Sequence, residues 1–385
     1  MKRKIFSLMV VVMLVASVFT LAGCGGGSTS GDGGDVIKIG ALGPYTGDTA
    51  SYGTAALAGI ELAVAHINEN GGVDGKQVEL ISYDTKGDAT EAVNAYNRLR
   101  DQDEVVAIVG PVLSGESLAV KDLAKEDNMP MISPTATADD VTVGAANSFR
   151  VCYLDAYQGI AAANYSVDGI QAKNAAILVS KGNAYSEGLA AAFTAKFEEK
   201  GGKIVGTESY AEKDTDFSAQ LTKIKDLNPE VIFVPDYYST VGPILQKAKE
   251  LGITAKFIGG DGWDSVQEEY AEVAEGAFFA NHYAADSPKE SVQAFIKAYK
   301  ENNEDKAPNS FAALGYDAMN VTAMAISNAD STEKDAIISA LATVEQDGVT
   351  GKFSFDEDGN PKGKEITIVE IKGGELTFVT TVAGE

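Results

Sequence analysis

Short apolar runs of strand length alternate along this chain with longer segments in which apolar residues recur every three or four positions. The first pattern is typical of strands buried in a parallel sheet, and the second of helices that cover such a sheet. After a short amino-terminal region, the pattern predicts strands at 36–42, 77–84, 105–111 and 130–133. It predicts helices between them at 51–70, 89–102 and 117–128.

The same alternation then starts again. Helices are predicted at 158–167, 186–201, 217–227 and 240–252, and strands at 174–180, 203–210, 229–235 and 255–261. Later segments predict helices at 289–302, 309–328 and 332–343, and a closing strand pair within 351–371 that turns at 358–361. Two arrays of similar size predict an α/β fold with two doubly wound parallel-sheet lobes.

The amino terminus predicts a signal peptide over residues 1–23. Basic residues at 2–4 precede an apolar run at 5–21, and small residues lead to Cys24 in LAGC. This arrangement resembles the bacterial lipobox, which implies cleavage before Cys24 and a lipid on its thiol; an uncleaved membrane anchor is the alternative. Cys24 and the Gly-rich segment 25–35 would form a flexible tether. We therefore expect the folded part outside the cytoplasmic membrane, held by acyl chains.

Composition narrows the possible partners. The formal net charge is −25 at pH 7, and such a field repels phosphate backbones and anionic lipid, so we expect no nucleic-acid partner. The chain contains two Cys and two His, which are too few to make Cys/His zinc sites or intramolecular disulfides a reasonable expectation. We expect no metal and no cofactor, and we expect Cys152 to be a small core residue.

Ligands of open parallel sheets bind beyond the carboxyl ends of the strands. The segments that follow the predicted strands are rich in Gly, Ser, Thr and Tyr, and contain Asp236 and Asp261 but no cluster of Lys, Arg or His. Such a cleft suits a small zwitterion or a neutral polar molecule. Trp263 either walls this cleft or packs in the core. Tyrosines at the strand ends would supply apolar walls with hydroxyl tips: Tyr45, Tyr52, Tyr185, Tyr237 and Tyr238.

Two neighbouring strand ends carry small hydroxyl residues. Ser114 precedes the helix predicted at 117–128, where backbone N–H groups and a hydroxyl make an anion site; a plain helix N-cap is the alternative. The next strand runs into SPTAT, where Thr135, Ala136 and Thr137 let a ligand approach the backbone and offer donors without charge. Together these residues would hold a carboxylate.

Asp261 lies in GGDGWD, with glycines on both sides. A carboxylate buried in a closing cleft needs a cation, which a ligand ammonium can supply. The alternative is a loop Asp that caps the following helix, a role that Asp264 fits better.

Catalytic and phosphate-binding motifs are missing from the sequence. His66 and His282 follow no nucleophile pattern, and we expect both to be structural. The sequence contains no G-x-S-x-G, no G-x-G-x-x-G after the first strand and no G-x-x-x-x-G-K-[ST]. The DEDGN segment at 356–360 has Pro361 where a calcium loop needs Gly, which favours a turn. We therefore expect a binding protein and not an enzyme.

Six longer stretches of the chain are informative as a set: IGALGPYTGDTASYG, AVAHINENGGVDGKQVELISYD, VVAIVGPVLSGES, MISPTATADD, DTDFSAQLTKIK and FIGGDGWDS. Together they resemble the substrate-binding lipoproteins of ABC importers, of the branched-chain amino acid (Leu/Ile/Val-binding) group in the type I periplasmic-binding-protein family. The resemblance implies two lobes joined by three crossings, near 153–155, 284–286 and 354–356. Lobe 1 would comprise 36–154 and 286–354, and lobe 2 would comprise 155–285 and 355–385.

The resemblance also implies roles for the candidate site residues. Ser114 and Thr137 match positions that bind the α-carboxylate, with Thr135 and Ala136 as adjacent backbone contacts. Asp261 matches the acidic position that binds the α-ammonium, and Tyr52 and Tyr185 match aromatic positions in the lining. The PDYY stretch departs from the glycine-rich form expected there, so Asp236 is a candidate to meet a polar or cationic ligand side chain.

The function implied is capture of a branched-chain amino acid in an interlobe cleft and its delivery to an ABC permease. A same-fold receptor for a polar amino acid, an amide or a urea-type ligand is one alternative, and a sensory ligand-binding module is another. We expect a monomer whose contact with the membrane is the lipid anchor.

Overall fold

The computed structural model describes residues 36–283, 285 and 288–382. The predicted signal peptide, Cys24 and the tether therefore lie outside the described residues. Within this part of the chain, no helix combines the length and apolar character needed to cross a bilayer.

A five-stranded sheet organises the first part of the chain. Every strand in it is parallel to its neighbours, in the order β2-β1-β3-β4-β5. The four predicted strands are present, and the fifth is a short strand that the hydrophobic pattern did not show. The strands are β1 (Ile37–Gly43), β2 (Val78–Asp84), β3 (Ala107–Val109), β4 (Met131–Ser133) and β5 (Ser148–Arg150).

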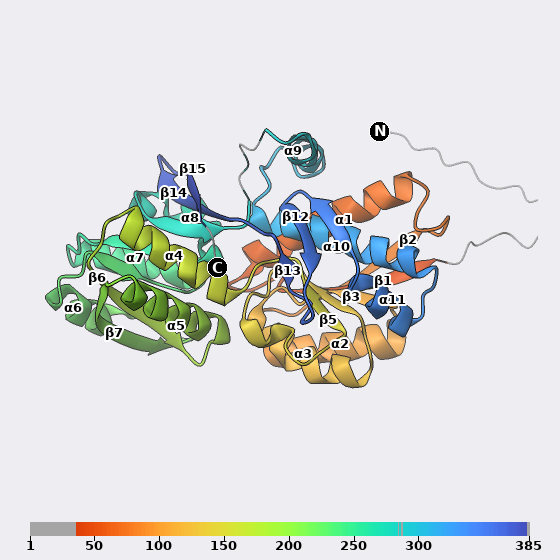
Figure 1. Cartoon of the computed structure of the whole chain (residues 1–385), viewed down its shortest axis with the longest axis horizontal. Coiled ribbons are helices and arrows are strands. Elements are labelled where there is room, and N and C mark those ends of the chain that lie inside the picture. The colour runs from red at the N-terminus through yellow and green to blue at the C-terminus, as the bar shows by residue number, and fades with distance from the viewer. Residues whose placement is uncertain (1–35, 284, 286–287, 383–385) are drawn as a thin grey trace, which may run out of the picture. The chain divides into compact units, whose positions relative to one another are not determined.

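Helices pack on both faces of this sheet (Figure 1). Ile39 and Ala41 of β1 join one apolar cluster with α1 and α10, whereas Leu42 joins another with α2 and α3. Successive side chains of a strand point to opposite faces, so a sheet buried on both faces reads as one apolar run. The helices are α1 (Ala50–Glu69), α2 (Ala89–Arg98), α3 (Ser114–Glu126), α9 (Glu290–Asn302), α10 (Ser310–Ala329) and α11 (Lys334–Leu341).

A seven-stranded sheet organises the second part, in the order β15-β14-β10-β9-β8-β6-β7. Five of its strands are parallel, four of which were predicted, and β14 and β15 add an antiparallel edge. Its strands are β6 (Asn174–Lys181), β7 (Lys203–Ala211), β8 (Val231–Phe233), β9 (Lys256–Gly259), β10 (Phe278–Asn281), β14 (Ile366–Lys372) and β15 (Glu375–Val382). Its helices are α4 (Asp155–Asp168), α5 (Ala184–Glu199), α6 (Ser218–Asp226), α7 (Tyr238–Glu250) and α8 (Val266–Ala274).

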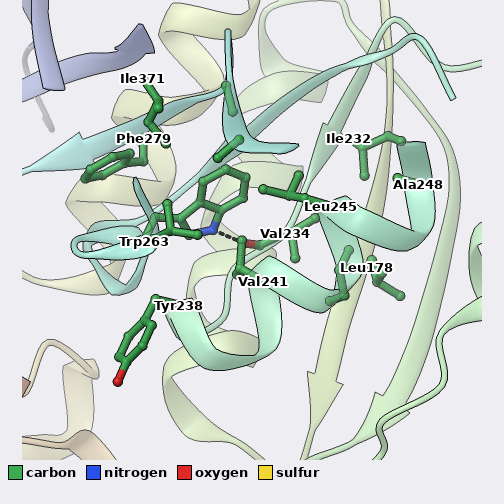
Figure 2. Packing of buried hydrophobic residues seen from close by; sticks show 14 of the residues in the cluster. Leu178, Ile232, Val234, Tyr238, Val241, Leu245, Ala248, Trp263, Phe279 and Ile371 are labelled. Atoms are coloured by element: carbon green, nitrogen blue, oxygen red, sulfur yellow. Dashed lines mark hydrogen bonds between the residues drawn. The ribbon is translucent and has the colours of Figure 1, made fainter. Parts of the chain in front are cut away.

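Trp263 is buried in the core of this second part and does not wall the cleft. Its indole N–H donates to the carbonyl oxygen of Val234 at 2.8 Å, and its ring packs among Phe279, Val241 and Leu245 (Figure 2). A Cβ on Gly259 would lie 2.0 Å from the indole nitrogen, so only glycine fits beneath the ring. This packing fixes the loop that begins at Asp261, two residues before the tryptophan.

The last strands differ from the prediction. The turn at 358–361 is present, but it joins β12 (Gly351–Phe355) to β13 (Pro361–Lys362), in a three-stranded sheet with β11 (Glu345–Gly348). Phe353 and Phe355 pack into the core of the first sheet. The chain joins the seven-stranded sheet only at β14, so the predicted pair does not form as one hairpin.

The crossings between the two sheets follow from these bounds. The first lies at 151–154, between β5 and α4, and overlaps the predicted 153–155. The second was predicted at 284–286, where residues 284 and 286 lie outside the described residues. The third lies at 363–365 and not at 354–356, because pairing between β12 and β13 keeps the chain beside the first sheet until Lys362.

Gly59→Ala is expected to lower the free energy of unfolding by roughly 1–3 kcal/mol, the usual cost of overpacking. A Cβ on Gly59 of α1 would lie 2.0 Å from the carbonyl oxygen of Ala312 in α10. Urea unfolding measures the change. The control is Gly115→Ala in α3, where a Cβ meets no heavy atom within 4 Å; equal effects of the two variants would contradict the close approach of α1 and α10.

Candidate functional site

A small cavity lies where strand ends of the two sheets face each other. Its volume is about 10 Å³, far below the roughly 300–1,000 Å³ of typical ligand pockets. A ligand can therefore enter only when the walls move apart. The lining residues on the side of the first sheet are Tyr52, Val112, Leu113, Ser114, Thr135, Thr137 and Phe311, and those on the side of the second are Tyr185, Tyr237, Asp261 and Gly262.

Hydroxyl groups and a helix start form the wall on the first sheet. Ser114 is the first residue of α3 and makes no capping bond; its Oγ accepts from the backbone N–H of Ala138 at 3.1 Å. The N-cap alternative for Ser114 is therefore wrong. The Thr135 hydroxyl donates to the carbonyl oxygen of Val112 at 2.7 Å, which ties the two strand ends together. The first N–H groups of α3 have no partner inside the helix, so they remain available to an anion.

Asp261 forms the opposite wall, and both of its carboxylate oxygens accept hydrogen bonds. Oδ1 accepts from the Tyr185 hydroxyl at 2.9 Å and from the Gln158 amide at 3.1 Å. Oδ2 lies 2.8 Å from Nε2 of His282. A Cβ on Gly260 or Gly262 would approach the Tyr185 hydroxyl to 2.9 or 2.7 Å, so the flanking glycines allow this tyrosine to reach Asp261.

Neither acid of the GGDGWD segment caps the helix that follows. Asp264 accepts at Oδ2 from the backbone N–H of Ser310 at 2.9 Å and from its hydroxyl at 2.6 Å. Ser310 is the first residue of α10, so Asp264 joins the second sheet's loop to a helix of the first. The capping role is wrong for both Asp261 and Asp264.

The negative charge beside the cavity has no fixed cation as a partner. His282 is the one described residue with a basic nitrogen within 4.0 Å of an Asp261 oxygen, and burial lowers the pKa of His282 below its usual value. The histidine is therefore neutral at pH 7 and donates from Nε2 without cancelling charge. Asp155 shares the Gln158 amide with Asp261. Burial, and then the charge of Asp261, raise the pKa of Asp155 well above its usual range.

Aromatic rings fill the space between the two polar walls. Tyr52 stacks on Phe311 with ring centroids 4.3 Å apart, and Tyr185 stacks on Tyr237 at 5.0 Å. The Tyr52 hydroxyl donates to the carbonyl oxygen of Gly262 and accepts from the backbone N–H of Tyr238 at 2.9 Å. Tyr52 thus belongs to α1 of the first sheet but bonds to two loops of the second.

Comparison with known proteins identifies the family. Residues 36–375 match the family described as periplasmic binding protein. The chain belongs to this family. Its members are extracytoplasmic substrate-binding receptors, and the two-sheet fold and the cavity between strand ends agree with that assignment.

Relatives that are named for amino acid binding match most of the chain. A leucine-, isoleucine-, valine-, threonine- and alanine-binding protein of Pseudomonas aeruginosa is 31% identical, covering 87% of this chain and 90% of its own. A Leu/Ile/Val-binding protein of Rhizobium johnstonii is 33% identical, covering 88% of this chain and 93% of its own.

Two solved structures are also similar. The branched-chain amino acid transporter substrate binding protein LivJ of Streptococcus pneumoniae, in complex with isoleucine, has a TM-score of 0.85 and 34% identity, and the match covers 91% of this chain and 100% of that one. The leucine binding protein LivK of Thermotoga maritima has a TM-score of 0.85 and 34% identity, covering 90% of this chain and 99% of that one.

Three predicted ligand residues of this family member do not line the cavity. Asp236 accepts from the Tyr210 hydroxyl at one oxygen and from the N–H of Tyr237 at the other, at 2.7 Å. Its carboxylate is thus hydrogen-bonded inside the second lobe and does not line the cavity. Ala136 is buried, and its backbone N–H donates a hydrogen bond to the Ser133 hydroxyl at 2.9 Å. Tyr45 donates its backbone N–H to Asp84 at 2.8 Å and is not among the lining residues.

Six residues of the site were not predicted from the sequence. Val112, Leu113 and Gly262 lie within two residues of predicted ones, and the other three are His282, Gln158 and Phe311. His282 directly follows β10, so the strand-end rule could have found it. Gln158 sits in α4, and Phe311 is the second residue of α10, whose start is fixed by the Asn309 side chain accepting from Ala312 N–H. No local signal marks these two positions, because they reach the cavity only through the way their helices pack.

The site shows no metal-binding arrangement: the described residues contain no group of three or more His, Cys, Asp or Glu that could hold an ion. Cys152 is fully buried and unpaired, and burial raises the pKa of its thiol to about 12. It is a core residue, as predicted.

Asp236→Asn is expected to stabilise the protein at pH 8. Burial raises the pKa of Asp236 to about 6 in the folded state, against about 3.9 in an unfolded chain. At a pH between these two pKa values the folded state binds more protons than the unfolded state. The free energy of unfolding therefore falls as pH rises through this range and stays low above pH 6. Urea unfolding should show a gain of roughly 1–3 kcal/mol at pH 8 that shrinks toward zero at pH 4. Asp226→Asn, at an exposed position of α6, is the control; a gain independent of pH would contradict the ionisation origin.

Proposed function

We propose that this protein is a non-enzymatic receptor that captures a branched-chain amino acid in the cavity between its lobes and delivers it to an ABC importer. One observation carries the proposal: the cavity has neutral donors on one wall, a carboxylate without a charged partner on the other, and aromatic rings between them. An amino acid zwitterion with an apolar side chain complements these three features.

The two charged ends of the ligand define its orientation. Its α-carboxylate would lie against Ser114, Thr137 and the start of α3, where N–H groups and hydroxyls donate without adding charge. Its α-ammonium would lie against Asp261, which removes the cost of a buried unpaired carboxylate. Binding of either end alone would leave the other wall unsatisfied, so the site favours a zwitterion.

The apolar lining supports an aliphatic side chain over a polar one. Val112, Leu113 and Phe311 line the cavity beside Tyr52. The alternative of a polar amino acid, amide or urea-type ligand rested on Asp236, and that carboxylate is bonded inside the lobe. The relatives named for leucine, isoleucine and valine, and the isoleucine in the LivJ structure, support the same choice.

Closure of the lobes would complete the site. Besides the Tyr52 and Asp264 bonds, the hydroxyls of Ser51 and Ser265 lie 3.0 Å apart and the Asn309 amide donates to Ser265 at 3.2 Å. All of these bonds join loops of the second sheet to α1 or α10. Opening must break them and ligand capture re-forms them, as in hinge closure of binding proteins.

The amino terminus would hold the receptor on the membrane. We infer cleavage after residue 23, lipid on Cys24 and a flexible tether over 25–35, with a monomer reaching a permease. Cys24→Ala should move the protein from the membrane fraction to the soluble fraction of cells. Retention of this variant in the membrane would favour the uncleaved anchor.

Residues 35–385 form one compact unit. Calorimetric titration of this fragment tests which class of ligand the protein binds. Leucine, isoleucine and valine should bind and should raise the melting temperature, because a ligand of the folded state stabilises it. Asparagine, glutamine and urea are the comparison ligands. Binding confined to these polar ligands would overturn the aliphatic assignment, and turnover of bound leucine would overturn the non-enzymatic role.

Asp261→Asn is expected to weaken leucine binding by roughly 2–5 kcal/mol, the range for removing one member of a buried charge pair. The amide keeps the size of the side chain but not its charge. Asp236→Asn is the matched control, since it changes a buried acid of the same lobe that does not line the cavity. A loss below tenfold in affinity for Asp261→Asn, or an equal loss in both variants, would remove Asp261 from the ammonium site.

A further inference from the structure

Arg150 lies directly behind the wall that carries the hydroxyl groups. It is the last residue of β5 and is fully buried. Its guanidinium makes four hydrogen bonds to the segment that follows β4. Nη1 donates to the carbonyl oxygens of Ala136 at 3.1 Å and Ala138 at 2.8 Å, and Nη2 donates to the carbonyl oxygen of Asp139 at 2.9 Å and to the Thr142 hydroxyl at 3.0 Å.

All four acceptors are neutral. Among the described residues, no carboxylate oxygen lies within 4.0 Å of the guanidinium nitrogens, and Nε is buried without a hydrogen-bond partner. Burial lowers the pKa of Arg150, but an arginine side chain retains its proton in proteins. The first lobe thus holds a buried positive charge that no protein carboxylate contacts, which is costly unless an anion approaches.

The acids nearest this charge do not offset it. Asp155 lies nearby, with its backbone N–H donating to the carbonyl oxygen of Thr137 at 2.9 Å, but it makes no ion pair with the guanidinium, and burial raises the pKa of its carboxyl well above the usual range. Burial raises the pKa of the Cys152 thiol to about 12, so this thiol is protonated at neutral pH. Asp139 is exposed and Asp356 is partly exposed, so water screens both charges.

The hydrogen bonds of Arg150 also orient the peptide groups of the wall. The carbonyl of Ala136 and the N–H of Thr137 belong to one planar trans peptide, so they point in opposite directions. Since this carbonyl faces Arg150, the N–H of Thr137 points away from the guanidinium, on the side where Thr137 lines the cavity. A cation on the carbonyl polarises the peptide and strengthens the donor at its other end.

Ser114 holds the same segment from the other side. Its Oγ accepts from the N–H of Ala138, while the carbonyl of Ala138 accepts from Arg150. Residues 136–138 are therefore held by hydrogen bonds between the start of α3 and the guanidinium. The planar guanidinium presents its donors as a rigid fork, in fixed directions, so these bonds fix the backbone conformation of the segment.

We propose that Arg150 is a positioning residue for carboxylate recognition: it aims the Thr137 N–H at the ligand and supplies the positive charge that makes the site select a free carboxylate over an amide. This inference rests on the proposed function. Arg150 touches no ligand atom; it acts through the peptide groups of 136–139 and through its field.

The test compares L-leucine with L-leucinamide on the purified protein, the weaker ligand being measured by competition at millimolar concentration. The wild type should prefer leucine by at least about 100-fold, since only leucine carries the anion. Arg150→Met should reduce this preference at least about tenfold by weakening leucine alone. Arg150→Lys, which keeps charge but loses the fork, should fall between them. Arg100→Lys, in a surface pair with Asp127, is the matched control and should leave the preference unchanged.

The outcomes separate this inference from the proposed function. A wild type that binds none of leucine, isoleucine and valine would sink the proposed function and this inference with it. A wild type that binds leucine, with Arg150 variants that weaken leucine and leucinamide by the same factor, would overturn only the role of Arg150, since a purely structural residue affects both ligands alike. Should Arg150→Met fail to fold, the Lys variant decides, and an unchanged preference in it together with unchanged leucine affinity overturns the inference.

Discussion

The direction of the parallel strands is the constraint on which this structure depends. In a parallel sheet every strand ends at the same edge, so the loops after β1, β3 and β4 gather at one edge and those after β6, β8, β9 and β10 at another. Chain crossings between the sheets let these edges face each other across the cavity. The donors of the first edge and the carboxylate of the second therefore come from segments more than 100 residues apart, without any one loop being long.

Electrostatics then separate the two walls. The chain carries a net charge of −25, yet the wall beside α3 holds neutral donors with a buried arginine behind them. The opposite wall holds Asp261, hydrogen-bonded by Tyr185, Gln158 and a neutral His282. In a zwitterion placed between the walls, the carboxylate faces the buried arginine charge and the ammonium faces Asp261. Neither wall has to break an ion pair of its own before the ligand binds.

Three aspartates at the strand ends of the second sheet show how packing assigns different roles to one residue type. Asp236 is bonded to Tyr210 inside its lobe, Asp264 is bonded to Ser310 across the lobes, and Asp261 lines the cavity. The sequence marked all three as strand-end acids. Asp236 was predicted to face the ligand but does not line the cavity, and Asp264 was predicted to cap the next helix but does not. Their partners come from β7 and α10, far away in the sequence.

The sequence by itself determined most of the parallel strands, most of the helices between them and the identity of seven cavity-lining residues, because apolar periodicity and strand order fix which residues occupy a strand end. It missed β5 and α8, which are short and weakly patterned, and also β11 and β15, and it misplaced the third crossing because β13 pairs with β12 and keeps the chain beside the first sheet. Only the tertiary structure decided which strand-end side chains enter the cavity. It also brought Gln158, His282, Phe311 and Arg150 to the walls of this cavity. Their roles depend on how separate helices and sheets pack together, and local sequence does not encode the direction in which a side chain points once its element is placed.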